Sequence, residues 1–350
     1  MRRSAVGAVA ALALVVAAGV LHYTQASAVA VFVVSGAALG GVAWMIGIAT
    51  ESVGSRFGPA ATGVLQSTLG NLPELFIVLF SLSAGQLVVA QFSILGSLFA
   101  NALLVLGLAI VAGSSGGRGV MRFEKRLPND TATLLLLSIF LIALLGLSDQ
   151  VGDRASQHQV AISVVGAICL LIVYGAWLFG YLRSDLEREL ALEEPTHDGV
   201  PFVWALVLLG VAGIAAAFVS AWFVDSINPA VEKLGISKAF TGLVIVAIAG
   251  NAVENVVAVQ LARKGKSDLA VSVVKNSVVQ IACFLFPVLV LVSLLFSEQL
   301  TFVVNPVFVG ALALTAISVW QITGDGEAVL FEGLALIALY VVLATLVWFE

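Results

Sequence analysis

Two short stretches, GNLPE at Gly70–Glu74 and GNAVE at Gly250–Glu254, decide how the fold of this chain is organised. Each places an asparagine and a glutamate three residues apart, and hence on one face of a helix, inside a long apolar run. A carboxylate at bilayer depth costs about 2.5 to 3.5 kcal/mol on insertion scales. Two of them in equivalent settings therefore mark a candidate functional site.

The composition is that of an integral membrane protein. Of the 350 residues, 61% are hydrophobic and 11% are charged, and the mean hydropathy is +1.11. The net charge of −5 comes largely from one short acidic segment, so it predicts no nucleic-acid partner. Cys169 and Cys283 both fall inside apolar runs, where we expect small core residues and no disulfide framework.

Apolar runs of about 20 residues, bounded by charged or turn residues, predict eleven membrane spans. They cover approximately residues 5–22, 28–50, 59–84, 86–113, 130–149, 159–182, 201–224, 237–262, 267–296, 303–321 and 327–348. The first run, with Arg2 and Arg3 before it, also has the pattern of a secretory signal, but its length favours a retained N-terminal helix in residues 1–27. Both alternatives start the chain in the cytoplasm.

The basic residues of the loops support this orientation. With the N-terminus inside, the cytoplasmic side holds twelve of the 16 basic residues and the opposite side holds three, while Lys275 lies within a span. This excess obeys the positive-inside rule. The odd number of spans then places the C-terminus outside, and the short N-terminus and compact loops fit a prokaryotic plasma membrane.

A polar connection at residues 183–200 separates two halves of the chain. It contains six acidic residues and predicts a short acidic cytoplasmic helix that Pro195 stops. A solvated linker and a weak cation-sensing or regulatory element both remain open as its role.

The two halves are related by a repeat. The motifs lie 180 residues apart, and the same offset aligns Ala90 with Ala270 and Ser97 with Ser277. We therefore predict one duplicated unit, with a first repeat before the acidic connection and a second repeat after it. The two repeats cover residues 28–182 and 201–350.

Five spans per repeat is an odd number, so the second copy must enter the membrane in the opposite sense. The predicted span through Glu74 runs from inside to outside, and the span through Glu254 runs from outside to inside. Inverted repeats place a site near the midplane, and rocking between them gives alternating access. The predicted fold is an all-α polytopic membrane protein of about 11 transmembrane helices, namely one N-terminal helix plus two inverted five-helix repeats.

The residue types of the motifs match the ligands of a hard divalent cation, which prefers carboxylate, amide and backbone oxygens. Glu74 and Glu254 supply carboxylates, and Asn71 and Asn251 supply amide oxygens. Glycine lets neighbouring backbone approach, and a proline within a span removes a helical hydrogen bond and frees a carbonyl. The residues predicted to break the helices in this way are Gly70, Pro73 and Gly250.

Two nearby carboxylates in a poorly solvated site share or take up protons when no cation is bound, because desolvation and like charge both disfavour the ionised form. The same groups can then carry either a cation or protons, which is the simplest chemistry for antiport. The alternatives are a pair of purely structural acids, and asparagines that only hold helices together.

Residues Gly70 to Gly107 and Gly250 to Val290 resemble the two signature repeats of the calcium/cation antiporter superfamily, most closely of its cation/proton exchanger branch. The resemblance implies calcium export against an inward proton gradient, with Glu74 and Glu254 as shared cation and proton ligands. It implies no cofactor beyond the transported calcium ion and protons. The further cation-binding candidates are Gln91, Gln280, Ser97, Ser277 and Asn101.

Three positions depart from the branch and are candidates for coupling or selectivity. Asn255 stands where the branch usually has histidine, Asn276 where it has glycine, and Lys275 where it has an apolar residue. A charged Lys275 near the glutamates lowers the site charge from −2 to −1 and suits a monovalent cation. Alternatively, Lys275 loses its proton when a cation arrives, or it points away from the site or pairs with another acid.

The sequence thus predicts a secondary active antiporter that exchanges calcium for protons by alternating access, with a sodium or potassium exchanger on the same scaffold as the alternative. An enzyme is not expected, because the chain lacks HExxH, GxSxG and nucleotide-loop motifs. A passive channel is a further alternative that proton-coupled flux would separate. The expected partners are calcium or another cation, protons and membrane lipid, and the oligomeric state is left open.

Overall fold

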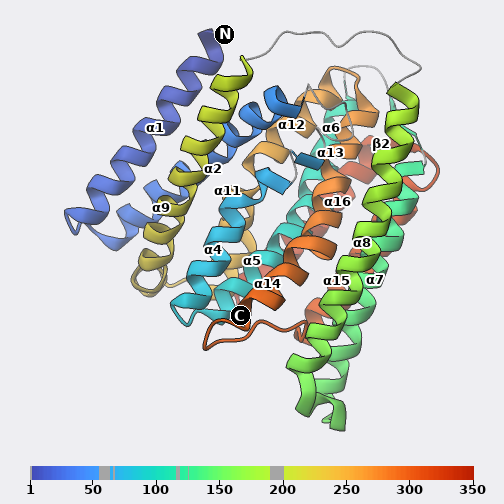
Figure 1. Ribbon diagram of the computed structural model, residues 1–350. Coiled ribbons are helices and arrows are strands. Elements are labelled where there is room, and N and C mark those ends of the chain that lie inside the picture. The colour runs from blue at the N-terminus through green and yellow to red at the C-terminus, as the bar shows by residue number, and fades with distance from the viewer. Residues whose placement is uncertain (1, 55–63, 66–67, 116–118, 125, 190–200) are drawn as a thin grey trace. The chain divides into compact units, whose positions relative to one another are not determined.

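The computed structural model describes residues 2–54, 64–65, 68–115, 119–124, 126–189 and 201–350 (Figure 1). Within these ranges, nine helices are long and apolar enough to cross a membrane. A tenth span arises if Lys238–Gly250 and Glu254–Arg263, bent by 55°, count as one. The chain is therefore a polytopic membrane protein. The predicted span at 59–84 lies partly outside the described residues, so the count of eleven stays a prediction.

The described residues form two compact units, each made of separate stretches of the chain. Unit 1 comprises Met1–Gly96, Trp177–Val253 and Val347–Glu350, and unit 2 comprises Ser97–Ala176 and Glu254–Leu346. This grouping by contact differs from the predicted division along the sequence, which stays a prediction.

In unit 1, helix α2 (Ala28–Gly54) packs against both α1 (Arg2–Tyr23) and α9 (Phe202–Leu234), which also contact each other. Small residues let α1 and α2 approach closely, as is common between membrane helices. A Cβ atom added to Gly41 would lie 3.0 Å from the Cβ atom of Ala11. Between α2 and α9, the rings of Phe32 and Phe223 stack with centroids 4.9 Å apart.

Helix α9 is longer than the predicted span at 201–224. It continues to Leu234 and ends at Gly235, whose φ of 66° is in the left-handed region that glycine adopts without strain. The other elements of unit 1 are α4 (Leu72–Ser83), most of α5 (Leu87–Phe99), α10 (Lys238–Phe240), the π-helix η3 (Thr241–Val246) and α11 (Ala247–Gly250).

Unit 2 contains the remaining elements. They are η1 (Ala100–Val105), α6 (Leu106–Ser114), β1 (Val120–Arg122), α7 (Arg126–Gln150), η2 (Arg154–His158), most of α8 (Gln159–Glu189), most of α12 (Ala252–Arg263), α13 (Ser267–Gln280), η4 (Ile281–Leu285), α14 (Phe286–Ser293), α15 (Pro306–Thr323), β2 (Glu327–Val329) and most of α16 (Leu330–Trp348). Of these, η1 and η4 are π-helices and η2 is a 3₁₀-helix.

A small antiparallel sheet, which the sequence did not predict, joins two loops of unit 2. Strands β1 and β2 pair Met121 with Ala328, and the Arg122 side chain forms a 3.0 Å ion pair with Glu327. The last span was predicted to begin at residue 327, but residues 327–329 form a strand, so the helix begins at Leu330.

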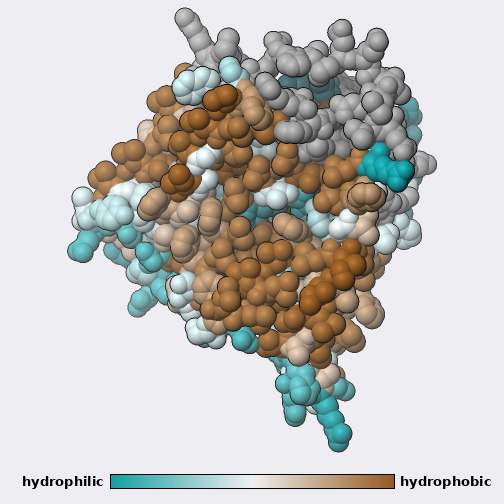
Figure 2. Space-filling view, viewed as in Figure 1, coloured by the Kyte–Doolittle hydropathy of each residue, from teal (hydrophilic) through white to brown (hydrophobic). Residues whose placement is uncertain are grey.

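The exposed surface of the described residues is largely apolar, as expected for helices that face lipid (Figure 2). This also explains one wrong prediction. Cys283 is buried as expected, but Cys169 is exposed on α8, close to the exposed Ile168 and Ile172. In a membrane protein an apolar run does not distinguish a core-facing side chain from a lipid-facing one.

The acidic connection at 183–200 is only partly described. Its first residues continue α8 as helix to Glu189, and residues 190–200, including Pro195, lie outside the described residues. The predicted end of an acidic helix at this proline therefore stays a prediction.

Candidate functional site

Both acidic motifs break their helix at the asparagine. Asn71 has φ −82° and ψ 4°, and Asn251 has φ −97° and ψ 23°, so both lie in the sparsely populated bridge region. A new helix starts at the next residue in each case, and Glu74 and Glu254 both fall in its first turn. The positive end of a helix dipole stabilises negative charge at this position. Each glutamate is therefore placed at the start of a half-helix.

Pro73 differs from its predicted role. It lies in the first turn of α4, where the missing N–H has no intrahelical acceptor to lose, so it does not interrupt a helix interior. The break is at Asn71. The carbonyl oxygen of Pro73 itself accepts a 3.4 Å hydrogen bond from the buried hydroxyl of Ser220 on α9.

The two motifs meet within unit 1. A Cβ atom added to Gly250 would lie 3.9 Å from the Cβ atom of Glu74, so the glycine lets the two backbones pass without an intervening side chain. Asn71, Glu74 and Asn251 are all buried, with Glu74 only 1% exposed. The Asn251 amide nitrogen donates to the Ala247 carbonyl over 2.8 Å, so this amide directs its nitrogen back into its own helix.

Unit 2 carries the second glutamate and several polar side chains with unused acceptor oxygens. Glu254 is 3% exposed, and neither carboxylate oxygen accepts a hydrogen bond from another described residue. The side-chain oxygens of Asn255, Asn276 and Ser277 likewise have no hydrogen-bond partner among the described residues. Since nearly all buried polar groups are paired in folded proteins, these oxygens have capacity for a cation or a proton.

The remaining candidates lie on the helices that follow each motif. In unit 2, Ser97 and Asn101 are fully buried, and the Asn101 amide nitrogen donates to the Ser97 carbonyl over 3.1 Å. Gln280, 2% exposed, is the last residue of α13 before the π-helix η4, and Asn101 lies within the π-helix η1. Gln91 on α5 is only partly buried. Local π-helix within α-helices is frequent at functional sites.

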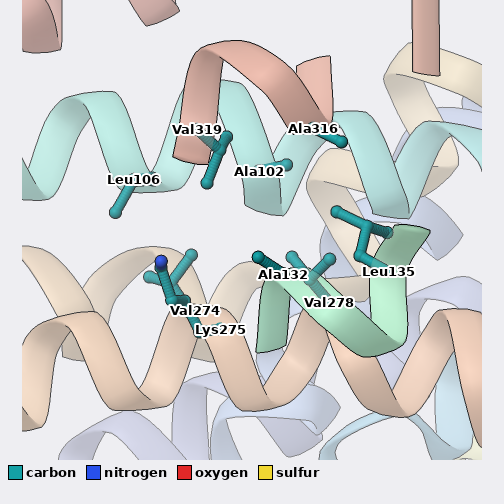
Figure 3. A pocket seen from close by; sticks show the side chains of 9 residues that line it. All are labelled: Ala102, Leu106, Ala132, Leu135, Val274, Lys275, Val278, Ala316 and Val319. Atoms are coloured by element: carbon teal, nitrogen blue, oxygen red, sulfur yellow. The ribbon is translucent and has the colours of Figure 1, made fainter. Parts of the chain in front are cut away.

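Lys275 does not reach the surface, and no carboxylate of a described residue lies within ion-pair distance of it. The side chain is 3% exposed and donates a 2.7 Å hydrogen bond to Thr323 Oγ1 on α15. It lines a cavity of about 20 Å³, roughly the room of one water molecule, whose other lining side chains are all aliphatic (Figure 3). Two residues along a helix correspond to a rotation of about 200°, so Lys275 and Ser277 occupy opposite faces of α13.

Sequence reasoning missed the hydroxyl groups that contact these candidates. Ser220, Thr323 and Tyr174 sit in apolar spans, and their partners Pro73, Lys275 and Gln280 lie far away in the sequence. A hydroxyl in an apolar span signals that some partner exists, but only packing reveals which one.

Comparison with known proteins confirms the predicted resemblance to the calcium/cation antiporter superfamily. The family model described as sodium/calcium exchanger protein matches residues 5–182 and 204–349. The chain therefore belongs to the sodium/calcium exchanger family. The two matched segments lie on either side of the acidic connection.

Curated relatives and solved structures cover nearly the whole chain. The Ca(2+)/H(+) antiporter of Synechocystis sp. is 32% identical over 348 residues, covering 94% of this chain and 93% of the relative. Ca(2+)/H(+) antiporter ChaA of Bacillus subtilis is 32% identical over 346 residues, covering 96% and 95%. The structure of native YfkE superimposes with a TM-score of 0.81 at 29% identity and covers 99% of both chains.

Proposed function

We propose that this protein is a secondary active antiporter that exchanges calcium for protons across a prokaryotic plasma membrane, without a bound cofactor. The observation that carries the proposal is Glu254, a buried carboxylate whose two oxygens accept no hydrogen bond from another described residue. A charge buried in this way needs a compensating cation or a proton. The names of the relatives in Synechocystis and Bacillus subtilis, both Ca(2+)/H(+) antiporters, support the same exchange.

Exchange follows from competition for the two glutamates. When Glu74 and Glu254 are ionised, their carboxylates and the neighbouring amide oxygens form the oxygen-rich environment that calcium prefers. When calcium leaves, protons neutralise the same carboxylates, because two ionised acids in a poorly solvated site repel each other. One calcium ion or two protons balance the same two negative charges, so either form can be buried while the carrier changes conformation.

The helix breaks also support a carrier that works by alternating access. Half-helices that start at the site are typical of carriers, where the irregular backbone is tolerated because it lines the ion-binding region. In this chain the breaks at Asn71 and Asn251 have nearly the same backbone conformation. This agreement supports the predicted relation between the two motifs.

The geometry of Lys275 weakens the sodium or potassium alternative. That alternative rested on Asn255 and on a positive charge at Lys275 beside the glutamates, which would leave the site with a single net negative charge. Instead the Lys275 side-chain nitrogen donates to Thr323, and the side chain lies on the face of α13 opposite Ser277. Calcium therefore remains the favoured substrate.

The proposal is tested by measuring cation-dependent proton flux in proteoliposomes with an imposed pH gradient. We expect calcium to drive proton movement in the wild type and Glu254→Gln to abolish it. Glu332→Gln is the matched control, because Glu332 already accepts a 2.8 Å hydrogen bond from the Val329 amide. A wild-type protein that responds to sodium or potassium but not to calcium would overturn the assignment.

A further inference from the structure

Two hydrogen bonds, one donated from each side, join helix α7 to the π-helix η4. The Ser138 hydroxyl, 1% exposed, donates to the Ala282 carbonyl over 2.9 Å. The Cys283 thiol donates to the Leu134 carbonyl over 3.3 Å. All four residues belong to unit 2. A π-helical turn alters the regular i→i−4 hydrogen-bond pattern, so these contacts fix a backbone segment that would otherwise be free to rearrange.

A second helix, α8, holds the residue that immediately precedes η4. Tyr174 is 5% exposed, and its ring lies 5.6 Å from the ring of Phe284 between centroids. Its side chain is also hydrogen-bonded to the side chain of Gln280. Gln280 and Phe284 are four residues apart and so lie one turn from each other on one side of the helix. The two contacts together fix Tyr174 against the turn where α13 passes into η4.

The chemistry of an amide makes this contact consequential. A glutamine side chain has an oxygen that binds a cation and a nitrogen that repels one, and the two ends exchange places by a simple rotation. A hydroxyl that accepts a hydrogen bond from the nitrogen fixes which end faces which way. Pre-orienting a ligand in this manner lowers the entropy that is lost when the ion binds.

We propose that Tyr174 is a positioning residue that accepts a hydrogen bond from the Gln280 amide nitrogen and so presents the Gln280 carbonyl oxygen to the transported cation. This inference rests on the proposed function and deepens it, because it assigns a role outside the two acidic motifs. Tyr174 acts through Gln280 and does not itself touch the ion. Its ring packing on Phe284 is a separate contribution that a phenylalanine would preserve.

The molecule offers a matched control in Tyr340 on α16. Tyr340 is 4% exposed, and its hydroxyl has no hydrogen-bond partner among the described residues. Tyr174→Phe and Tyr340→Phe each remove one buried hydroxyl and keep the ring. Only the first change removes a contact to a candidate ligand.

The experiment measures calcium-dependent proton flux in proteoliposomes as a function of calcium concentration. We expect Tyr174→Phe to raise the KM for calcium about 10-fold with little change in the maximal rate, as for partners of metal ligands in general. Tyr340→Phe should leave both values unchanged. In a Gln280→Ala background, Tyr174→Phe should have no further effect, because the group it positions is gone.

A rescue distinguishes positioning from a general effect on folding. Gln280→Glu provides two equivalent oxygens that need no orientation, so Tyr174→Phe should raise KM far less in that background. The inference would be overturned by a wild-type KM in Tyr174→Phe. It would also be overturned if Tyr174→Phe raised KM as much in the Gln280→Ala and Gln280→Glu backgrounds as it does in the otherwise wild-type protein. A wild type without calcium-dependent flux would instead overturn the proposed function, so the two failures are distinguishable.

Discussion

The stretches at 72–114 and 252–293, which belong to the two predicted repeats, carry their helices in the same order. Helices α4 and α12 begin at residues 72 and 252, α5 and α13 begin at 87 and 267, and α6 and α14 begin at 106 and 286, each pair 180 residues apart. The π-helices η1 and η4 fall between the same elements in each copy. Each stretch therefore combines a buried glutamate in the first turn of a helix with a π-helix further along the chain.

The copies differ at positions 95–96 and 275–276. Gly96 lies directly against the backbone of Leu243, so a Cβ atom there would come 2.5 Å from the Leu243 Cα atom. The matching position in the second copy is Asn276, which is buried with its side-chain oxygen unpaired among the described residues. One copy uses this turn for close backbone packing, and the other uses it for polar side chains.

The largest expected effect is on the two glutamates. Glu74→Gln and Glu254→Gln should each lower calcium-dependent proton flux by more than about 100-fold, because each removes a charged ligand and a proton carrier. This loss is larger than that expected for a residue that only hydrogen-bonds to a ligand. The measurement is the initial rate in proteoliposomes, with Glu332→Gln as the control. If one variant retained near wild-type flux, the two copies would not contribute equally to the site.

The next effect is on folding and concerns Gly96. Gly96→Ala should destabilise the protein by about 1–3 kcal/mol, because the new methyl group collides with backbone that cannot rotate away. Thermal unfolding in detergent measures this change. Gly175→Ala on α8 is the control, since a Cβ atom there meets nothing within 4 Å. Equal unfolding temperatures for the two variants would contradict the close packing of Gly96 against the Leu243 backbone.

A smaller effect is expected at Lys275. Lys275→Leu, which copies Leu95, should leave the KM for calcium within about threefold of wild type, because the lysine faces away from Ser277. The unfolding temperature should stay equal or rise, since a buried polar side chain is replaced by an apolar side chain of similar volume. Loss of the calcium response, or a new sodium response, would instead place the lysine charge at the site.

The last prediction tests the inverted arrangement of the two repeats with cysteine substitutions that should have the smallest effect on transport activity. Ala84 and Lys264 are exposed, occupy matching positions after α4 and α12, and each precedes a glycine with positive φ. Ala84→Cys and Lys264→Cys, in a background with Cys169 and Cys283 replaced by alanine, should react with a membrane-impermeant maleimide from opposite sides. We expect Ala84→Cys to label from outside and Lys264→Cys from the cytoplasm, and labelling from one side would contradict inverted repeats.

Much of this architecture could be predicted from the sequence, because a bilayer forces apolar runs to become helices and makes buried acids conspicuous. Glu74 and Glu254 are buried, as their positions in apolar runs predict. The sequence did not predict the strand pair of Met121 and Ala328, because three-residue strands have no periodicity to detect.

The hydrogen-bond partners of buried polar side chains also could not be predicted from the sequence. Lys275 is one residue from Asn276 and two from Ser277, so its position in the sequence suggests that it lies at the candidate site. Its actual partner, Thr323, lies 48 residues away on another helix and follows from packing. The contact between Tyr174 and Gln280 is hidden for the same reason.

The most direct test of a shared cation and proton site is calorimetry of calcium binding to the purified protein at several pH values, in buffers with different ionisation enthalpies. Competition predicts that binding releases protons and that calcium affinity falls as the pH is lowered, because protons then occupy Glu74 and Glu254. Glu254→Gln should release fewer protons and bind calcium more weakly. Calcium binding that neither releases protons nor depends on pH would contradict a site in which the same carboxylates carry either substrate.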